Sequence, residues 1–155
     1  MSTVKMDTKI YIEPKLFDSK IKEHIFCKLR EKTLLTCVDG LGYVMDVSKI
    51  NTIKNVHSNL FIVNHESTLF KPEKDTVYNG IVRMICKEGI FAEINDIQKV
   101  LVPTSFIYDT YEYNDNMFIC KKNTNKTIDV NVELKIKLTT IKYYNTKFNC
   151  IGQIV

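Results

Sequence analysis

Hydrophobic and polar residues alternate along most of this chain, with one helical stretch near its start. Residues 9–12 alternate and stop before Pro14, which has no amide to donate to a ladder, so they predict a short first strand. Asp18 or Ser19 can then cap a helix, because a short side-chain oxygen accepts hydrogen bonds from the free amides of a first turn. Apolar residues four apart, with charged residues on the other side, predict an amphipathic helix that ends near Lys32.

β-type residues dominate the rest of the first half. Residues 34–38 and 43–50 are β-rich runs, separated at residues 39–42 by two glycines that flank a leucine. Such a break indicates a tight turn or a bulged, bent strand. Residues 56–64 and 67–70 supply the last strand of this half. The order strand, helix, three strands predicts a small α+β domain with its helix on one face of an antiparallel sheet.

The second half begins with three short β-type runs, at residues 77–86, 90–94 and 99–102. A polar stretch at residues 109–126 follows, and it is long for a loop, so it is either partly structured or functional. Strict alternation at residues 128–138 predicts a strand with one buried face, and the chain closes with a last β-type run. Five strands, the third and fourth joined by a long connection, predict an OB-type Greek-key barrel.

The predicted fold class is therefore α+β, in two domains. Residues 1–72 form the small α+β domain, and residues 73–155 form the five-stranded OB-fold barrel. Phe70, Lys71 and Pro72 lie between them as an interdomain hinge. Pro72 stiffens the link by fixing its own φ, and Phe70 can seal the junction.

Composition limits the kind of protein. With 45% hydrophobic and 26% charged residues the chain is typical of folded soluble proteins, and its net charge of +4 is mild. No apolar run approaches the roughly 20 residues of a membrane span, and residues 1–8 lack a signal-peptide core, so we expect an intracellular location without a membrane partner. The five cysteines are far apart and odd in number, so we expect free, buried thiols.

Catalytic and metal-binding patterns are absent from the sequence. There is no glycine-rich phosphate loop, no nucleophile elbow and no spaced set of carboxylates, so we expect that the chain is not itself an enzyme and needs no cofactor. His24 and Cys27 lie three apart on the predicted helix, but no second pair completes four metal ligands. We therefore expect no metal site.

Contact with RNA is the chemistry that the barrel suggests. An OB barrel binds single strands on its second and third strands, where aromatic rings stack on bases and cations neutralise phosphates. The candidate RNA-binding residues are Arg83, Lys87, Phe91 and Lys99. The alternative at this point is an ordinary solvated face.

Several short motifs, in order along the chain, resemble a known family. They are Leu41, Gly42 and Tyr43, then Phe70, Lys71 and Pro72, then Val77, Gly80, Val82, Gly89 and Val102, and finally Ile151, Gly152 and Ile154. This series resembles the seventh subunit of eukaryotic RNA polymerases, whose archaeal counterpart is the E subunit. The resemblance covers nearly the whole chain and keeps the order of the elements.

The resemblance implies a non-catalytic stalk subunit of a multisubunit DNA-directed RNA polymerase, which supports transcription initiation. Its first domain would dock on the core subunits through Gly40, Leu41, Gly42 and Tyr43, and its barrel would lie near nascent RNA. The family's companion is a helical fourth subunit that packs along both domains. The alternative for the docking residues is that Gly42 allows a bend and Tyr43 packs locally.

The sequence also suggests a source for the chain, a cellular location and an alternative function. The short chain and an abundance of Asn, Lys, Ile and Tyr favour an AT-rich genome, such as that of a large DNA virus. The expected location is the nucleus for a cellular protein, or the host cytoplasm and the virion for a viral one. The alternative function is a free-standing OB-fold protein that binds single-stranded RNA in translation or RNA decay, because fold alone does not fix function.

Overall fold

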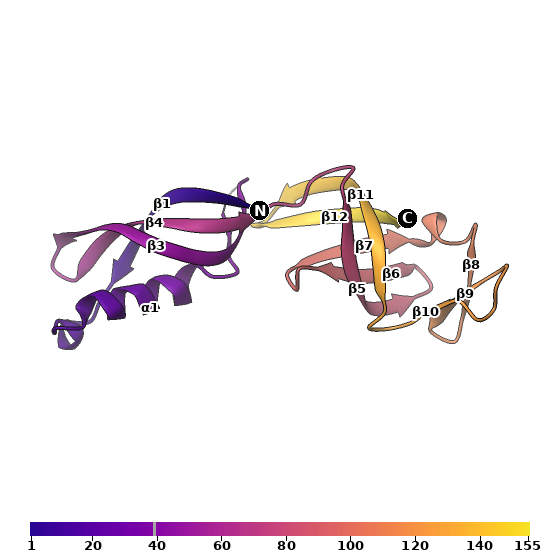
Figure 1. The fold of residues 1–155 in the computed structure, drawn as a ribbon, viewed down its shortest axis with the longest axis horizontal. Helices are drawn as coiled ribbons and strands as arrows, with labels where there is room; N and C mark the ends of the chain where they lie inside the picture. Colours follow the sequence, from indigo (N-terminus) through magenta and orange to yellow (C-terminus); the bar gives the residue numbers. More distant parts are fainter. Residues whose placement is uncertain (39) are drawn as a thin grey trace. The chain divides into compact units, whose positions relative to one another are not determined.

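The structure, a computed structural model, describes residues 1–38 and 40–155 and divides into two compact units, Met1–Lys71 and Pro72–Val155 (Figure 1). Asp39, part of the break expected at residues 39–42, lies outside the described residues. The elements of the first unit are β1 (Ser2–Tyr11), the 3-10 turn η1 (Pro14–Leu16), α1 (Ile21–Thr33), β2 (Cys37–Val38), β3 (Gly42–His57) and β4 (Leu60–Phe70).

The first unit is an antiparallel sheet of order β1-β4-β3-β2 with α1 on one face (Figure 1). Ile25 and Leu29 of the helix are fully buried in a core with Ile10, Val44 and Val63 of three strands. Burying one apolar stripe of a helix against a sheet is what the four-residue spacing requires. The prediction of one helix on an antiparallel sheet is confirmed.

Several strand boundaries of the first unit differ from the prediction: β2 is only Cys37–Val38 instead of residues 34–38, and β3 continues to His57 instead of ending at residue 50. β1 begins at Ser2 instead of residue 9, because its whole length pairs with β4, from Ser2 opposite Leu69 to Tyr11 opposite Leu60. The run at residues 56–64 is not one strand, since Ser58 has a φ of 49° in the turn that joins β3 to β4. β-type residues on both sides of this short turn hid it from the pattern.

The second unit contains β5 (Val77–Cys86), β6 (Gly89–Ile94), β7 (Gln98–Pro103), the 3-10 turn η2 (Thr104–Phe106), β8 (Tyr111–Asn114), β9 (Met117–Cys120), β10 (Thr127–Ile128), β11 (Glu133–Tyr144) and β12 (Lys147–Ile154). Five of these strands close a barrel in the order β11-β12-β7-β6-β5. β7 and β12 pair in parallel, and the other neighbours are antiparallel. The predicted five-stranded barrel is confirmed.

Ile136 fills the barrel interior between two glycines on neighbouring strands. A Cβ atom on Gly152 would lie 2.5 Å from Ile136 Cγ2, and one on Gly80 would lie 2.8 Å from Ile136 Cδ1. A side chain at either position would force Ile136 to move, and the conflict is more severe at Gly152, where the Lys137 carbonyl oxygen also lies 3.1 Å from the Cβ position. The two glycines thus let β5 and β12 close around β11.

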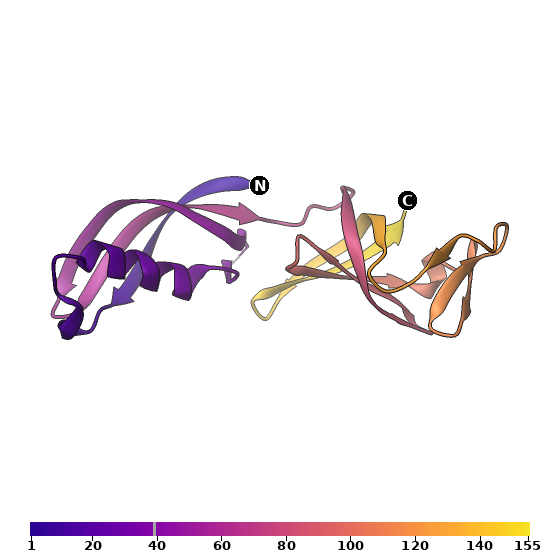
Figure 2. The same ribbon diagram turned by 60° about the horizontal axis from the view of Figure 1, so that its bottom comes forward.

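The long connection between β7 and β11 is partly structured. It carries a small sheet of order β10-β9-β8, which lies at one end of the barrel (Figure 2). The strict alternation at residues 128–138 does not form one strand, because residues 129–132 turn between β10 and β11. Asp129 Oδ1 accepts a hydrogen bond from the Val130 amide, and Asn131 has a φ of 71°. Turn chemistry at these polar residues outweighs the alternation.

The five cysteines are free thiols, but they are not all buried. Cys120 and Cys150 are buried, whereas Cys27 is exposed and the other two are half-buried, so the expectation of five buried thiols is wrong. Burial raises the pKa of the Cys150 thiol to about 11. In the described part of the chain, no helix is long and apolar enough to cross a membrane.

A buried histidine connects β1 and β4. His65 has no exposed surface, and its Nε2 and Nδ1 atoms lie 2.8 Å from Thr8 Oγ1 and 2.7 Å from Ser67 Oγ. Burial lowers the pKa of His65, while the nearby carboxylate of Asp7 opposes that shift. Both ring nitrogens thus have hydroxyl partners that suit a neutral imidazole.

We expect the free energy of unfolding to fall as the pH drops below about 6.5, the ordinary pKa of histidine. The unfolded chain takes up a proton there, whereas folded His65 resists protonation, so its contribution is complete above that pH and is lost on acidification. Urea titrations at pH 7.5, 6.5 and 5.5 measure the effect. His65→Gln should flatten this dependence, and the exposed His57→Gln control should keep it. An equal pH dependence of the unfolding free energy in the two variants would show that His65 is not its source.

Candidate nucleic-acid interface and docking loop

Strand alternation decides which barrel residues face solvent. Ile90, Ala92 and Ile94 of β6 are buried inside the barrel, so Phe91 and Glu93 lie on its outer surface. Phe91 is half-buried there and pairs with Leu101 of β7, which in turn lies beside Ile151 of β12. These three side chains form an outer apolar row across three strands.

Arg83, Phe91 and Lys99 share this outer face of β5, β6 and β7, but its charge is balanced. A bulge between Val82 and Met84 presents Arg83 to two carboxylates, with guanidinium-to-oxygen distances of 3.7 Å to Glu93 and 3.3 Å to Asp96. Lys99 also lies opposite Glu93. Exposed ion pairs add little stability, yet these two acids cancel the positive charge that a phosphate would need.

Lys87 lies elsewhere, at the turn between β5 and β6. It lines a groove with Tyr108 and Tyr113 from the connection that carries β8. The structure therefore brings three of the four candidate RNA-binding residues to one face and places the fourth in a separate groove.

A more basic surface lies on β11 and β12, outside the residues that the sequence predicted for RNA binding. Ile136 and Leu138 point inward, so Lys135 and Lys137 lie outside. After the bulge at Leu138/Thr140, Lys142 is opposite Asn149 and Tyr144 is opposite Lys147. We call this set, together with Lys99 one strand away, the basic face; its members are Lys99, Lys135, Lys137, Lys142, Tyr144 and Lys147.

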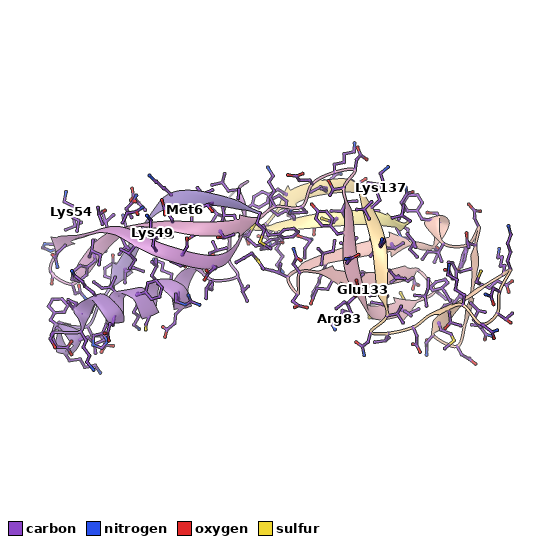
Figure 3. All side chains as sticks on the ribbon, viewed as in Figure 1. Met6, Lys49, Lys54, Arg83, Glu133 and Lys137 are labelled. Atoms are coloured by element: carbon purple, nitrogen blue, oxygen red, sulfur yellow. The ribbon has the colours of Figure 1, made fainter. Side chains whose placement is uncertain are left out.

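Strands β11 and β12 themselves carry few acids, and the nearest acids on other segments are Glu93, opposite Lys99, and Asp75, whose amide donates to the Leu138 carbonyl. β12 contains no carboxylate, and β11 contains only Glu133, at its first residue. In Figure 3, Glu133 lies near Arg83 at one end of β11, away from Lys137. Tyr144 is 74% exposed, so its ring is accessible for stacking. Lysines at every second position of a strand could have indicated this surface, since they must share one side.

These groups can bind a single-stranded nucleic acid. Lysine ammonium groups neutralise phosphates, and exposed rings stack on bases of any sequence. On the outer surface Lys142 lies opposite Asn149, and Lys99 comes one residue before Val100, which pairs with Cys150. The apolar row of Phe91, Leu101 and Ile151 crosses the same strands β7 and β12. The outer surface of β7, β12 and β11 thus combines charge with apolar contact area.

The expected docking loop divides into an exposed tip and a buried base. Gly40 and Leu41 are exposed, with Leu41 at 46%, whereas Tyr43 is only 7% exposed and pairs with Phe70. Gly42 has a φ of 127°, and a Cβ atom there would lie 2.5 Å from the Phe70 carbonyl oxygen. Gly42 and Tyr43 therefore hold the loop in place, and Gly40 and Leu41 are the residues that a partner could touch.

The hinge residues mark the end of the first unit. Phe70 is the last residue of β4 and is buried by 96% of its surface, while Lys71 is exposed and ends the unit. Pro72 begins the second unit. Among the residues that the structure describes, no group of three or more His, Cys, Asp or Glu side chains could hold a metal ion.

Two curated proteins are similar to this chain over nearly its whole length. The DNA-directed RNA polymerase II subunit 7 of Arabidopsis thaliana is 24% identical over 157 residues, which cover 96% of this chain and 89% of that protein. The DNA-directed RNA polymerase II subunit RPB7 of Glycine max is 24% identical over 160 residues, with the same coverage of both chains. No family model matches the chain.

The similarity to a solved structure is weaker and covers about half of the chain. The apo form of Mycoplasma genitalium RNase R matches 53% of this chain with 20% identity and a TM-score of 0.43. This chain covers 13% of that one.

The two glycines of the docking loop should respond differently to substitution. Gly42→Ala should cost more than about 2 kcal/mol of unfolding free energy, because the new Cβ meets the Phe70 carbonyl and the φ is strained. Gly40→Ala should cost about 1 kcal/mol, because the new Cβ meets no atom within 4 Å and the only penalty is an alanine in the left-handed φ region. Chemical denaturation measures both. Equal losses would contradict the close approach at Gly42.

Proposed function

We propose that this chain, a homologue of the seventh subunit of DNA-directed RNA polymerase II, acts as a non-catalytic stalk subunit of a multisubunit DNA-directed RNA polymerase. The observation that carries the proposal is the extent of the similarity, which spans 96% of the chain and therefore both compact units. If this chain and its relatives had only an RNA-binding barrel in common, the similarity would be confined to residues 72–155. Similarity across both units favours a common assembly.

The two units would divide the work. The first unit docks on the polymerase core, with Gly40 and Leu41 as the exposed tip and Gly42, Tyr43 and Phe70 as its rigid support. The barrel contacts nascent RNA and supports initiation. A helical partner like the family's fourth subunit completes the stalk, and the site of action is the nucleus for a cellular enzyme or the host cytoplasm and virion for a viral one.

RNA contact is proposed for the basic face, with Phe91 and Lys99 kept from the sequence candidates. Arg83 contributes less, because Glu93 and Asp96 already neutralise it. A transcript laid across β7, β12 and β11 would meet lysines on every strand, while the apolar row beside them offers surface to the bases. Such contact is electrostatic and weak for the isolated chain, and it strengthens when a polymerase delivers the transcript.

The alternative, a free-standing RNA-binding protein, rests on the closed barrel alone. It requires the isolated chain to bind RNA tightly and to have no large partner. The two experiments below separate these functions.

The double variant Lys142→Glu/Lys147→Glu should weaken binding of the full chain to a twelve-residue oligouridine at least tenfold at low salt. Removing two phosphate contacts should also reduce the slope of log K against log salt by about 1.4, or about 0.7 for each contact. Arg83→Ala should change the affinity less than twofold, because its charge is already paired. Fluorescence anisotropy over a salt series measures both quantities. A larger loss of oligouridine affinity in Arg83→Ala than in the double variant would indicate that RNA binds on β5 and β6 instead.

A tagged chain expressed in its native host should co-purify with the large catalytic polymerase subunits and a small helical protein. Leu41→Asp should reduce their recovery at least fivefold, because it places a charge at the exposed tip of the docking loop. Lys142→Glu/Lys147→Glu is the matched control and should leave recovery unchanged. Quantitative mass spectrometry of the purified material measures the ratio. Recovery of a ribosome or a nuclease complex without polymerase subunits would favour the alternative function.

A further inference from the structure

A groove of about 1100 Å³ lies between the β5–β6 turn and the small sheet of the second unit. The turn contributes Lys87 and Glu88 to its wall, and the other side is formed by Tyr108 and by residues of β8. The β8 residues on the lining come from both faces of the strand, namely Tyr111 and Tyr113 from one and Glu112 and Asn114 from the other. The lining also includes Ile119 of β9, which is opposite Glu112, and Lys121 and Thr124 after β9. The groove therefore runs along β8 and extends over the face of the small sheet that carries Glu112.

One edge of β8 has no neighbouring strand within the described chain. The small sheet has the order β10-β9-β8, so β8 pairs with β9 alone. The Lys121 amide donates to the Thr110 carbonyl at 2.9 Å, which fixes the alternation of the ladder. Hydrogen-bonded pairs recur every second residue in an antiparallel ladder, so Glu112 directs its backbone groups to β9 and Tyr113 directs its groups outward.

The outward backbone groups of β8 face the groove. The Tyr111 amide is occupied, since it donates to the Ile107 carbonyl at 2.9 Å. Because hydrogen bonding alternates along the β8–β9 ladder, the Tyr111 carbonyl, the Tyr113 amide and the Tyr113 carbonyl point away from β9, toward the free edge of β8. One donor flanked by two acceptors is the pattern that an added strand pairs with.

The far wall of the groove is fixed by hydrogen bonds. The Tyr108 hydroxyl donates to the Lys87 carbonyl at 3.3 Å, and the Thr104 amide donates to the Glu88 carbonyl at 3.2 Å. The Lys121 ammonium donates to the Tyr108 carbonyl. The turn and the β8 edge are thereby held as two sides of one preformed groove, which lowers the entropic cost of binding.

Charge and ring packing favour a peptide over a nucleic acid here. Lys87 and Lys121 on the lining are balanced by Glu88 and Glu112, and the two carboxylates would repel phosphates. Tyr111 is buried, and the ring of Tyr113 packs edge-on against Phe118 with centroids 5.5 Å apart. Tyr108 is 44% exposed, whereas Tyr111 and Tyr113 have little open ring face for stacking on bases. The preference for a peptide of mixed polarity therefore rests mainly on the two carboxylates.

We propose that the groove binds an extended peptide segment of a protein partner, which adds to β8 as a fourth strand of the small sheet. Two of its amides donate to the Tyr111 and Tyr113 carbonyls, and one of its carbonyls accepts from the Tyr113 amide. Alternate side chains then contact the tyrosines, so apolar residues belong at every second position, with polar residues between them that face Glu112 and Asn114. A four-residue strand spans about 13 Å, which sets a segment of about four to six residues.

The test begins with selection of decapeptides from a display library on the immobilised full chain. The selected peptides should share apolar residues at alternate positions. Each backbone amide of a selected peptide is then methylated in turn, and affinity for the unmodified chain is measured by anisotropy. Methylation at alternate amides should weaken binding at least tenfold, and methylation between them less than twofold, because only every second amide faces β8.

A variant of the chain provides the reciprocal test. Tyr113→Pro removes the amide that faces the groove, and proline is tolerated on a strand edge whose amide is unpaired. It should weaken peptide binding at least tenfold, while Tyr113→Phe and the basic-face variant Lys142→Glu/Lys147→Glu bind as the unmodified chain does. The methylation series uses the unmodified chain, so it decides the question even where Tyr113→Pro does not fold.

Four results would overturn the proposal. They are the failure of selection, a methylation series without alternation, peptide affinity unchanged in folded Tyr113→Pro, and a dimer that Tyr113→Pro dissociates, which would assign the edge to a second copy. Loss of oligouridine binding in Tyr113→Pro with no selected peptide would assign the groove to RNA instead. None of these readouts depends on association with a polymerase, so this proposal and the proposed function fail separately.

Discussion

The fit of Ile136 between Gly80 and Gly152 is the constraint on which the second unit depends. One isoleucine side chain of β11 fills the space that two missing Cβ atoms leave on β5 and β12, so the β11–β12 hairpin packs closely against β5 in the five-stranded barrel. Closure fixes the inward and outward sides of every strand in it. With Ile136 inside, Lys135 and Lys137 must lie outside, so the packing of the interior also determines where the positive charge collects.

The same logic explains which parts of the fold the sequence could predict. Alternation of apolar and polar residues predicted β6 and β7 to within one residue at each end, and the four-residue spacing of apolar residues predicted α1. These predictions succeeded because each of these elements buries one side. It failed at residues 128–138, where alternation continues through Asp129 and Asn131 although the backbone turns. Alternation alone cannot reveal a turn when the polar and apolar positions keep the same order through it. The turn before β4 was missed for another reason, because β-type residues lie on both sides of it.

The candidate interface was less predictable than the fold, because charge depends on neighbours across strands. Arg83 looks free in sequence, yet the bulge beside it brings it to Glu93 and Asp96. Lys142 and Lys147 come together only through the pairing of the β11–β12 hairpin and the bulge within it, which the sequence of one strand does not reveal. The groove beside β8 lies in a stretch that looks like a polar loop, since strands of two to four residues are too short for a periodic signal.

The most direct test of the account is photocrosslinking of RNA in the assembled enzyme. A photoreactive amino acid replaces Tyr144 in one preparation and Arg83 in another, and polymerase purified through each variant chain is stalled with a labelled transcript. We predict that the transcript crosslinks at residue 144 at least several-fold more than at residue 83, because it contacts the basic face and not the surface of β5 and β6, where Glu93 and Asp96 neutralise Arg83. Polymerase that lacks the chain, or crosslinks confined to residue 83, would contradict the account.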